Sequence, residues 1–228
     1  MSKLIVVSPH LDDAVFSCWH SLNIADVVIT VFAGIPPDGT SAWWDRLCGE
    51  KDSSKMIKNR IAENNKALAY SKSKAINLNF LDAQYRKDSV GAKDIAQEIA
   101  NNSSLTDIFM VNLGGSAWCH KDHILTREAG IELLNQGCSV SFYADIPYMS
   151  LPGNPSKLFL NQMQNKATKL THRSIEVIAT KLDDQSYLDK IAAVKEYASQ
   201  YQAINLTSFG RLDRYLKSRY ELEFKVIA

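Results

Sequence analysis

A turn rich in chemically active side chains lies near the N-terminus. The stretch "VVSPHLDDAVFS" begins as an apolar run, brings together His10, Asp12 and Asp13, and returns to apolar residues at Ala14. Desolvating two carboxylates and an imidazole is costly unless another group pairs with them. The turn contains no glycine, and its negative charges would repel phosphate, which argues against a nucleotide-binding turn of the GxGxxG type. Its oxygen and imidazole ligands favour a cation instead.

A second polar cluster, "HKDH", lies more than a hundred positions further along the chain and supplies His120 and His123. Side chains three apart on a helix face the same direction. Two histidines and one aspartate, drawn from these residues and from His10, Asp12 and Asp13, would form a familiar catalytic zinc site with a fourth position for water. Zinc lowers the pKa of that water towards ~7 and polarises a carbonyl, and a spare carboxylate can accept the proton. The two clusters together predict a metal-dependent hydrolase.

Strands that alternate with helices predict the scaffold that brings these clusters together. Short β-branched runs indicate buried strands, and apolar residues at helical spacing indicate helices between them. This alternation predicts an α/β fold, Rossmann-like, with a mostly parallel sheet covered by helices on both faces. We expect one domain over residues 1–228, with an irregular excursion at about 147–170. The expected strands are 3–8, 26–34, 75–81, 105–113, 138–145 and 174–180, and the expected helices cover 13–22, 52–70, 183–200 and segments beginning near Ser89 and His120.

The order of the strands predicts where the two clusters meet. Each cluster follows an expected strand, the first and the fourth along the chain. In doubly wound sheets these two strands are commonly neighbours, and ligands bind at the carboxyl ends of the strands. We therefore expect both clusters at one edge of the sheet.

Composition narrows the class of partner. The chain has 26 basic and 25 acidic residues, so no basic field favours nucleic acid. No segment approaches the ~20 apolar residues of a membrane span, and the N-terminal apolar run is too short for a signal peptide. Four cysteines without a CxxC pair indicate reduced thiols. We expect a cytoplasmic protein with a small-molecule substrate, with neither nucleic acid nor membrane as partner; a homo-oligomer stays open.

Several motifs resemble one known family. The sequence is similar to the PIG-L/LmbE-type zinc de-N-acetylases, which remove acetyl from substrates that contain N-acetylglucosamine. Their signatures (P/A)HPDDE and HxDH correspond to "PHLDDA" and "HKDH" here. Further matches span most of the chain: "FAGIPP", "WDRLCGE", "RIAENNKAL", "FLDAQYR", "YADIPY" and "KIAAVKEYASQ".

The resemblance implies roles for the matching residues. His10, Asp13 and His123 would bind Zn²⁺, with another divalent ion such as Fe²⁺ as an alternative. Asp12 would be the general base. His120 would stabilise the tetrahedral intermediate or protonate the leaving amine.

Other residues have weaker assignments. Asp122 would tune His120, or else serve as a carboxylate that favours a helix N-terminus. The resemblance also implies that Arg60 and Asp82 hold sugar hydroxyls; a structural salt bridge is the alternative. Aromatic faces stack on sugars, so Trp44, Trp118 and Tyr148 are candidates for the substrate pocket, with anchoring of loops as the alternative for the tryptophans.

Two positions depart from the signature. Leu11 replaces the usual Pro, and Ala14 replaces the usual Glu. Neither change removes a ligand or the base, so we expect activity to survive. The sequence thus predicts a zinc-dependent hydrolase that removes an acetyl group from an N-acetylated amino sugar or its conjugate. The alternatives are a metal-dependent amidohydrolase acting on a non-sugar N-acyl substrate and a non-catalytic, metal-containing sugar-binding module.

Overall fold

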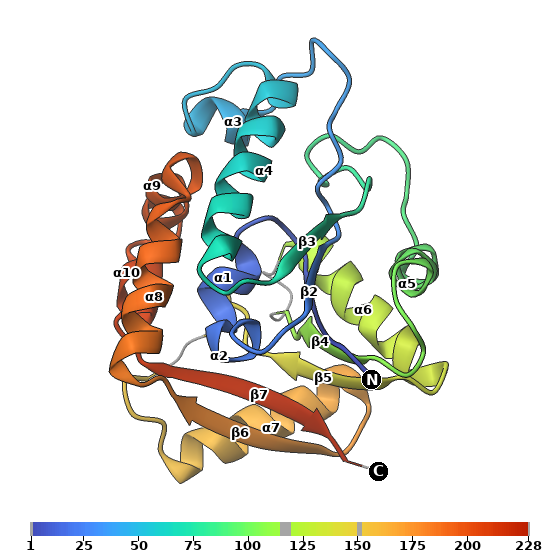
Figure 1. The fold of residues 1–228 in the computed structure, drawn as a ribbon, viewed down its shortest axis with the longest axis vertical. Helices are drawn as coiled ribbons and strands as arrows, with labels where there is room; N and C mark the ends of the chain where they lie inside the picture. Colours follow the sequence, from blue (N-terminus) through green and yellow to red (C-terminus); the bar gives the residue numbers. More distant parts are fainter. Residues whose placement is uncertain (1, 115–119, 150–151, 228) are drawn as a thin grey trace.

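A mixed seven-stranded sheet forms the centre of the protein (Figure 1). The structure is a computed structural model that describes residues 2–114, 120–149 and 152–227. The strand order is β3-β2-β1-β4-β5-β7-β6, in which β1 to β5 are parallel and β7 runs antiparallel to both of its neighbours. The strands are β1 Leu4–Ser8, β2 Val27–Thr30, β3 Lys74–Asn77, β4 Ile108–Asn112, β5 Ser139–Tyr143, β6 Ile175–Lys181 and β7 Tyr220–Val226.

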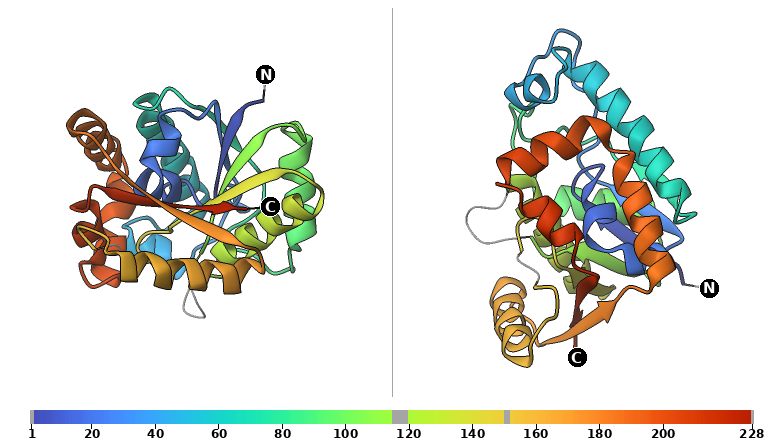
Figure 2. Two further views of the ribbon diagram at one scale, coloured as in Figure 1. Left: turned by 90° about the horizontal axis from the view of Figure 1, so that it is seen from below. Right: turned by 90° about the vertical axis from the view of Figure 1, so that its left-hand side faces the viewer.

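Helices cover both faces of this sheet, as the alternating pattern predicts. One layer contains α5, α6 and α7, and the other contains α1, α2, α4 and α8 (Figures 1 and 2). The helices are α1 Asp13–Ser17, α2 Trp19–Leu22, α3 Trp43–Leu47, α4 Ser53–Ala69, α5 Ala92–Asn101, α6 Lys121–Asn135, α7 Lys157–Thr171, α8 Asp184–Lys195, α9 Ala198–Thr207 and α10 Arg211–Leu216.

The central strands are apolar on both faces because each face is covered. Every residue of β2 is buried, and Val6 of β1 pairs in register with Val28 of β2 and Met110 of β4. The helix α6 approaches the sheet closely at Gly130, where a Cβ atom would lie 3.1 Å from a methyl group of Val111. A side chain here would push α6 away from β4. The prediction that β1 and β4 are neighbours is confirmed.

Two expected features, at 147–170 and 13–22, are wrong in detail. Most of the stretch expected to be irregular, 147–170, is the helix α7, whose Phe159, Leu160 and Met163 pack against the core. Its polar outer surface weakened the helical pattern. The expected helix 13–22 is divided at Cys18 into α1 and α2.

The C-terminal region contains elements that the periodicity did not predict. The strand β7 lies between β5 and β6, although "YELEFKV" does alternate polar and apolar residues. The expected helix 183–200 ends early as α8, and α9 begins at Ala198 after a turn. Figures 1 and 2 show α8 and α9 beside α4. This arrangement lets the end of the chain contribute to the edge of the sheet where β1 and β4 end.

The helix α4 begins as predicted. Asp52 is its N-cap, and the carboxylate accepts hydrogen bonds from the backbone N–H groups of Ser54 at 3.0 Å and Lys55 at 3.3 Å. Nowhere in the described part of the chain is a helix both long and apolar enough to cross a bilayer.

Candidate active site

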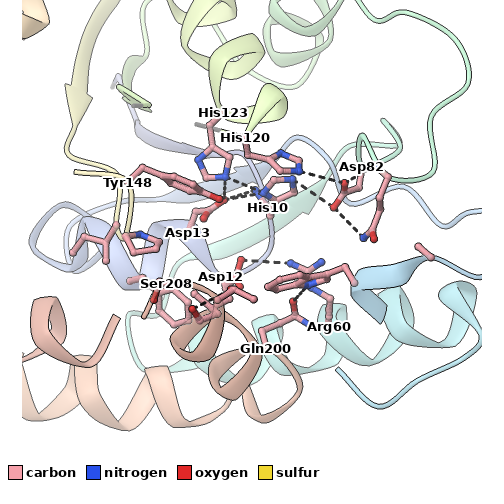
Figure 3. A pocket seen from close by; sticks show the side chains of 18 of the residues that line it. His10, Asp12, Asp13, Arg60, Asp82, His120, His123, Tyr148, Gln200 and Ser208 are labelled. Atoms are coloured by element: carbon pink, nitrogen blue, oxygen red, sulfur yellow. Dashed lines mark hydrogen bonds and ion pairs between the residues drawn. The ribbon is translucent and has the colours of Figure 1, made fainter. Parts of the chain in front are cut away.

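The candidate active site lies at the carboxyl ends of the parallel strands (Figure 3). Loops after β1, β3, β4 and β5 meet there, and α3 and α9 face them. The arrangement agrees with the general rule for ligand sites in open α/β sheets. It brings together the two clusters that the sequence separates.

The turn after β1 is held by a buried serine. The Ser8 hydroxyl donates to the backbone oxygen of His10 at 2.6 Å and accepts from the backbone N–H of Ala14 at 3.1 Å. The backbone N–H of His10 donates to Asp13 at 2.9 Å. Leu11 and Ala14, the two departures from the family signature, are both buried. The hydrogen bonds that close the turn therefore do not involve the side chains of Leu11 and Ala14.

Three potential ligand atoms converge at one point. His10 Nδ1 lies 3.2 Å from Asp13 Oδ2 and 3.1 Å from His123 Nε2, and the last two atoms are 3.3 Å apart. Zinc bonds of about 2.0–2.1 Å would separate the ligand atoms of a tetrahedral site by about 3.3 Å. The side chains therefore fit a shared ion of this kind.

Each of these histidines has a carboxylate at its other ring nitrogen. His123 Nδ1 is hydrogen-bonded to the buried Asp145, and His10 Nε2 lies 3.2 Å from Asp122 Oδ2. Such contacts determine which imidazole nitrogen has a free lone pair. Arg86 in turn holds Asp122 with a contact of 2.6 Å. The network directs His10 Nδ1 and His123 Nε2 towards the same point.

The electrostatics of this cluster favour a cation. Burial by itself would lower the pKa of His10, but hydrogen bonds to Asp122 and Asp13 outweigh it and raise the pKa. Burial also opposes protonation of His123, yet the charges of Asp13 and Asp145 raise its pKa. Since the carboxylates favour positive charge on both rings, they would favour a divalent ion between them for the same reason. The His and Asp groupings here are consistent with a divalent metal site.

Asp12 diverges from its neighbour Asp13. Asp12 Oδ1 lies 3.5 Å from the Arg60 guanidinium, while Asp12 Oδ2 is buried and has no hydrogen-bond partner among the described residues. Burial raises the pKa of Asp12, and the positive charge of Arg60 offsets part of this rise. The side chain does not cap α1 either. It leaves an unpaired acceptor at the pocket beside the potential ligands.

His120 is the N-cap of α6, and its side chain faces the His10 ring with 5.0 Å between centroids. Burial, together with the positive charge expected on His10, lowers the pKa of His120 to about 4. The Asp122 carboxylate lies 3.8 Å from His120 Nδ1 and 3.2 Å from His10 Nε2, so Asp122 is nearer to His10 than to His120. Burial by itself would raise the pKa of Asp122, but the hydrogen bond to His10, the charge of His10 and the backbone N–H of Ala83 outweigh it and lower the pKa to about 2.

The remaining predicted site residues line one pocket of about 790 Å³. Asp82 lies 3.6 Å from His10 Nε2 and accepts a hydrogen bond from the backbone N–H of Gln84. The Tyr148 ring packs against His123 with 4.7 Å between centroids. Trp44 lines the pocket, and its indole N–H donates to the side chain of Gln200 at 3.0 Å. Trp118 lies outside the described residues.

Several residues of the site and its surroundings were not predicted. Asp145 lies in "YADIPY", one of the segments that resemble the family, and its position after β5 was the available signal. Gln84 and Arg86 lie two and four positions after the predicted Asp82, in the segment "FLDAQYR" that resembles the family. Gln200 carried no signal, because nothing local indicates that α9 folds back over the site.

Comparisons with known proteins show similarity to deacetylases. Residues 5–134 match the PIG-L family, described as GlcNAc-PI de-N-acetylase. No curated protein matches the sequence. Among solved structures, a triple mutant of a deacetylase from the teicoplanin biosynthetic pathway is 24% identical, with a TM-score of 0.74 over 99% of this chain and 98% of that one.

Two further structures share the fold. The A40926 pseudoaglycone deacetylase Dbv21 is 22% identical, with a TM-score of 0.74 over 99% of this chain and 97% of that one. The N,N'-diacetylchitobiose deacetylase from Pyrococcus horikoshii is 15% identical, with a TM-score of 0.58 over 99% and 84%. At these identities the structures support the fold, whereas the sequence match covers more than half of the chain and includes both polar clusters. The chain belongs to the PIG-L family.

Proposed function

We propose that this protein is a zinc-dependent hydrolase that removes the acetyl group from an N-acetylated amino sugar or its conjugate. One observation carries the proposal: His10 Nδ1, Asp13 Oδ2 and His123 Nε2 lie within 3.1–3.3 Å of one another beside an unpaired oxygen of Asp12. Membership of the PIG-L family and the similarity to sugar and glycopeptide deacetylases support the choice of substrate.

The proposed metal ligands are His10, Asp13 and His123. Zinc bound there would supply Lewis-acid chemistry, lowering the pKa of a water molecule and polarising the acetamide carbonyl. Asp122 and Asp145 would keep the two imidazoles in the required orientation. Another divalent ion, such as Fe²⁺, is the alternative that metal analysis would reveal.

The protein's own side chains would carry the proton transfers. Asp12 takes a proton from the attacking water as the new C–O bond forms at the acetamide carbon. His120 donates a hydrogen bond to the carbonyl oxygen as negative charge develops on it. The C–N bond then breaks, and the nitrogen receives a proton from Asp12 or from His120. The products are acetate and a free amine.

Asp82 and Arg60 would position the sugar. Both line the pocket, and Asp82 has a carboxylate within reach of a hydroxyl group in it. Arg60 pairs with Asp12, which supports a second role in holding the base; its buried Nε–H has no partner among the described side chains. Trp44 and Tyr148 supply aromatic surface for the ring.

The substrate is proposed to be a small molecule and the compartment to be the cytoplasm. The described cysteines, Cys18, Cys48 and Cys138, are free thiols, which is consistent with a reducing compartment. The near balance of basic and acidic residues supports neither nucleic acid nor a charged surface as partner.

A substrate panel with metal analysis tests the proposal. Purified protein is assayed for metal content, and acetate release is measured from N-acetylglucosamine conjugates and from N-acetylated amino acids. We expect about one zinc per chain and acetate from the sugars. Acetate from the amino acids alone would favour an amidohydrolase of non-sugar substrates. Sugar binding without acetate release would favour a binding module.

A further inference from the structure

The pocket extends well beyond the potential metal ligands. Its volume of about 790 Å³ lies in the upper part of the range for ligand pockets, about 300–1,000 Å³. The potential metal ligands occupy one side, and Gln200 and Ser208 lie on the opposite side (Figure 3). This second side offers room for a group attached to the sugar.

One face of α9 forms much of this second side. Gln200, Ile204 and Thr207 follow one another at spacings of four and three, so they share a face of the helix. These three residues and the C-cap Ser208 all line the pocket. Arg211, the first residue of α10, continues the lining. From Gln200 to Ser208 this row of side chains spans about 12 Å at 1.5 Å per residue.

Hydrogen bonds hold this second side of the pocket in place. The buried Gln200 accepts from the Trp44 indole at 3.0 Å. Ser199 donates to Glu63 of α4 through its backbone N–H at 2.9 Å and its hydroxyl at 2.6 Å. The Tyr197 hydroxyl donates to Asn64 at 2.8 Å. Because these bonds join α9 to α3 and α4, the second side of the pocket is preformed rather than assembled by the substrate.

The charges of the pocket are separated between its two sides. Two of the three acidic lining residues, Asp13 and Asp82, lie beside the potential metal ligands. The third, Asp12, lies between the two sides and is paired with Arg60 (Figure 3). Arg211 lies on the other side, exposed to solvent, and no carboxylate of the described chain forms an ion pair with it. Arg60, the other lining arginine, already faces Asp12. An arginine without a carboxylate partner in a substrate pocket is suited to bind an anionic group.

We propose that the group attached to the sugar carries a negative charge, a carboxylate or a phosphate, which Arg211 binds at the end of the pocket remote from the acetamide. The part between the sugar and the charge lies against Ile204 and against the Trp43 indole, which is 65% exposed. This inference rests on the proposed deacetylase function and specifies its substrate class.

Matched glycosides test the proposal. Phenyl, 4-carboxyphenyl and 4-phosphophenyl glycosides of N-acetylglucosamine have the same sugar and differ in charge. For the wild-type protein we expect kcat/KM to be about tenfold higher for an anionic glycoside than for the phenyl glycoside, mainly through a lower KM. The carboxylate and phosphate arms show which anion is preferred.

Substitutions at two arginines assign the effect. Arg211→Gln is expected to reduce the anionic-to-neutral ratio of kcat/KM to about one, and Arg211→Glu to reverse it. Arg214→Gln is the control, since Arg214 is an exposed residue of the same helix α10 that does not line the pocket. It should keep the wild-type ratio. Equal ratios in the wild type and in both Arg211 variants would overturn the inference.

Failure of the inference can be told apart from failure of the proposed function. If the wild type releases acetate from all three glycosides at equal kcat/KM, deacetylation stands and the anionic site does not. If no glycoside releases acetate, binding of the same glycosides to Asp12→Asn is measured by calorimetry. The anionic site is still supported if Asp12→Asn binds the anionic glycosides more tightly than the phenyl glycoside and if adding Arg211→Gln to this variant removes the difference. Equal binding of all three glycosides to Asp12→Asn would refute the site.

Discussion

His10 Nδ1 and His123 Nε2 lie 3.1 Å apart although 113 positions separate the two residues in the chain. The contact arises because β1 and β4 are neighbouring parallel strands, so the loops that follow them leave the sheet at the same edge. Asp13 completes the group. Two imidazole nitrogens that can both offer a lone pair, at this distance from each other and beside a carboxylate, form a suitable ligand set for one ion.

Asp12→Asn should separate catalysis from metal binding. The substitution keeps the shape of the side chain but removes its ability to take a proton, while the proposed ligands remain. We expect kcat for deacetylation to fall by about 10²–10⁴-fold, with metal content unchanged. Kinetics and metal analysis of the same sample check this. Full activity in the variant would exclude Asp12 as the base.

Asp145→Asn should weaken metal binding without touching a ligand. Asp145 is buried and hydrogen-bonded to His123 Nδ1, so the amide would hold the ring less firmly. We expect metal affinity to decrease about 10–100-fold, measured by competition with a chelator. Asp107→Asn is a matched control, because Asp107 is also buried and accepts backbone N–H bonds, but before β4 at the opposite end of that strand. Equal affinities in the two variants would contradict the assignment.

Lys190→Met should destabilise the fold. Lys190 of α8 is 2% exposed and donates to Glu221 of β7 at 2.7 Å. Removing the lysine leaves a buried carboxylate whose remaining hydrogen-bond partners in the described part of the chain are the backbone N–H groups of Trp19 and His20. We expect the free energy of unfolding to fall by about 3–5 kcal/mol, measured by urea denaturation. Lys195→Met, at an exposed position of α8, should change it by less than about 0.5 kcal/mol.

Cys48 should make stability depend on alkaline pH. Burial raises the pKa of this thiol from 9.0 to about 11. Between these values the unfolded chain has lost the proton that the folded chain retains, so the free energy of unfolding should fall as the pH rises through this window. Cys48→Ser removes the contribution. Urea denaturation at pH 8 and at pH 10 should show a smaller decrease for the variant than for the wild type; identical decreases would contradict the assigned pKa.

Local sequence patterns were sufficient for the central strands and for the polar turns that follow them. In "KLIVVS" and "DVVIT", continuous β-branched residues require burial on both faces, which only a covered parallel sheet provides. Asp52 could be recognised as a helix cap because capping depends on residues within one turn. The strand β7 and the helices α3, α7 and α10 were not predicted. In α7 the polar outer face dilutes the helical pattern, and α3 and α10 are too short to show one.

The sequence alone specifies the reactive side chains and the strands that lead to them: two clusters of histidine and aspartate, each just after a buried strand. The folded arrangement adds that Asp13 contacts both histidines while Asp12 faces Arg60. It also shows that Asp145 holds His123 and that α9 closes the far side of the pocket. The physical reason is distance along the chain. Spacing specifies partners within a few residues, whereas contacts between loops and helices far apart depend on how the whole sheet orders its strands and on which surfaces the core leaves for the last helices to cover.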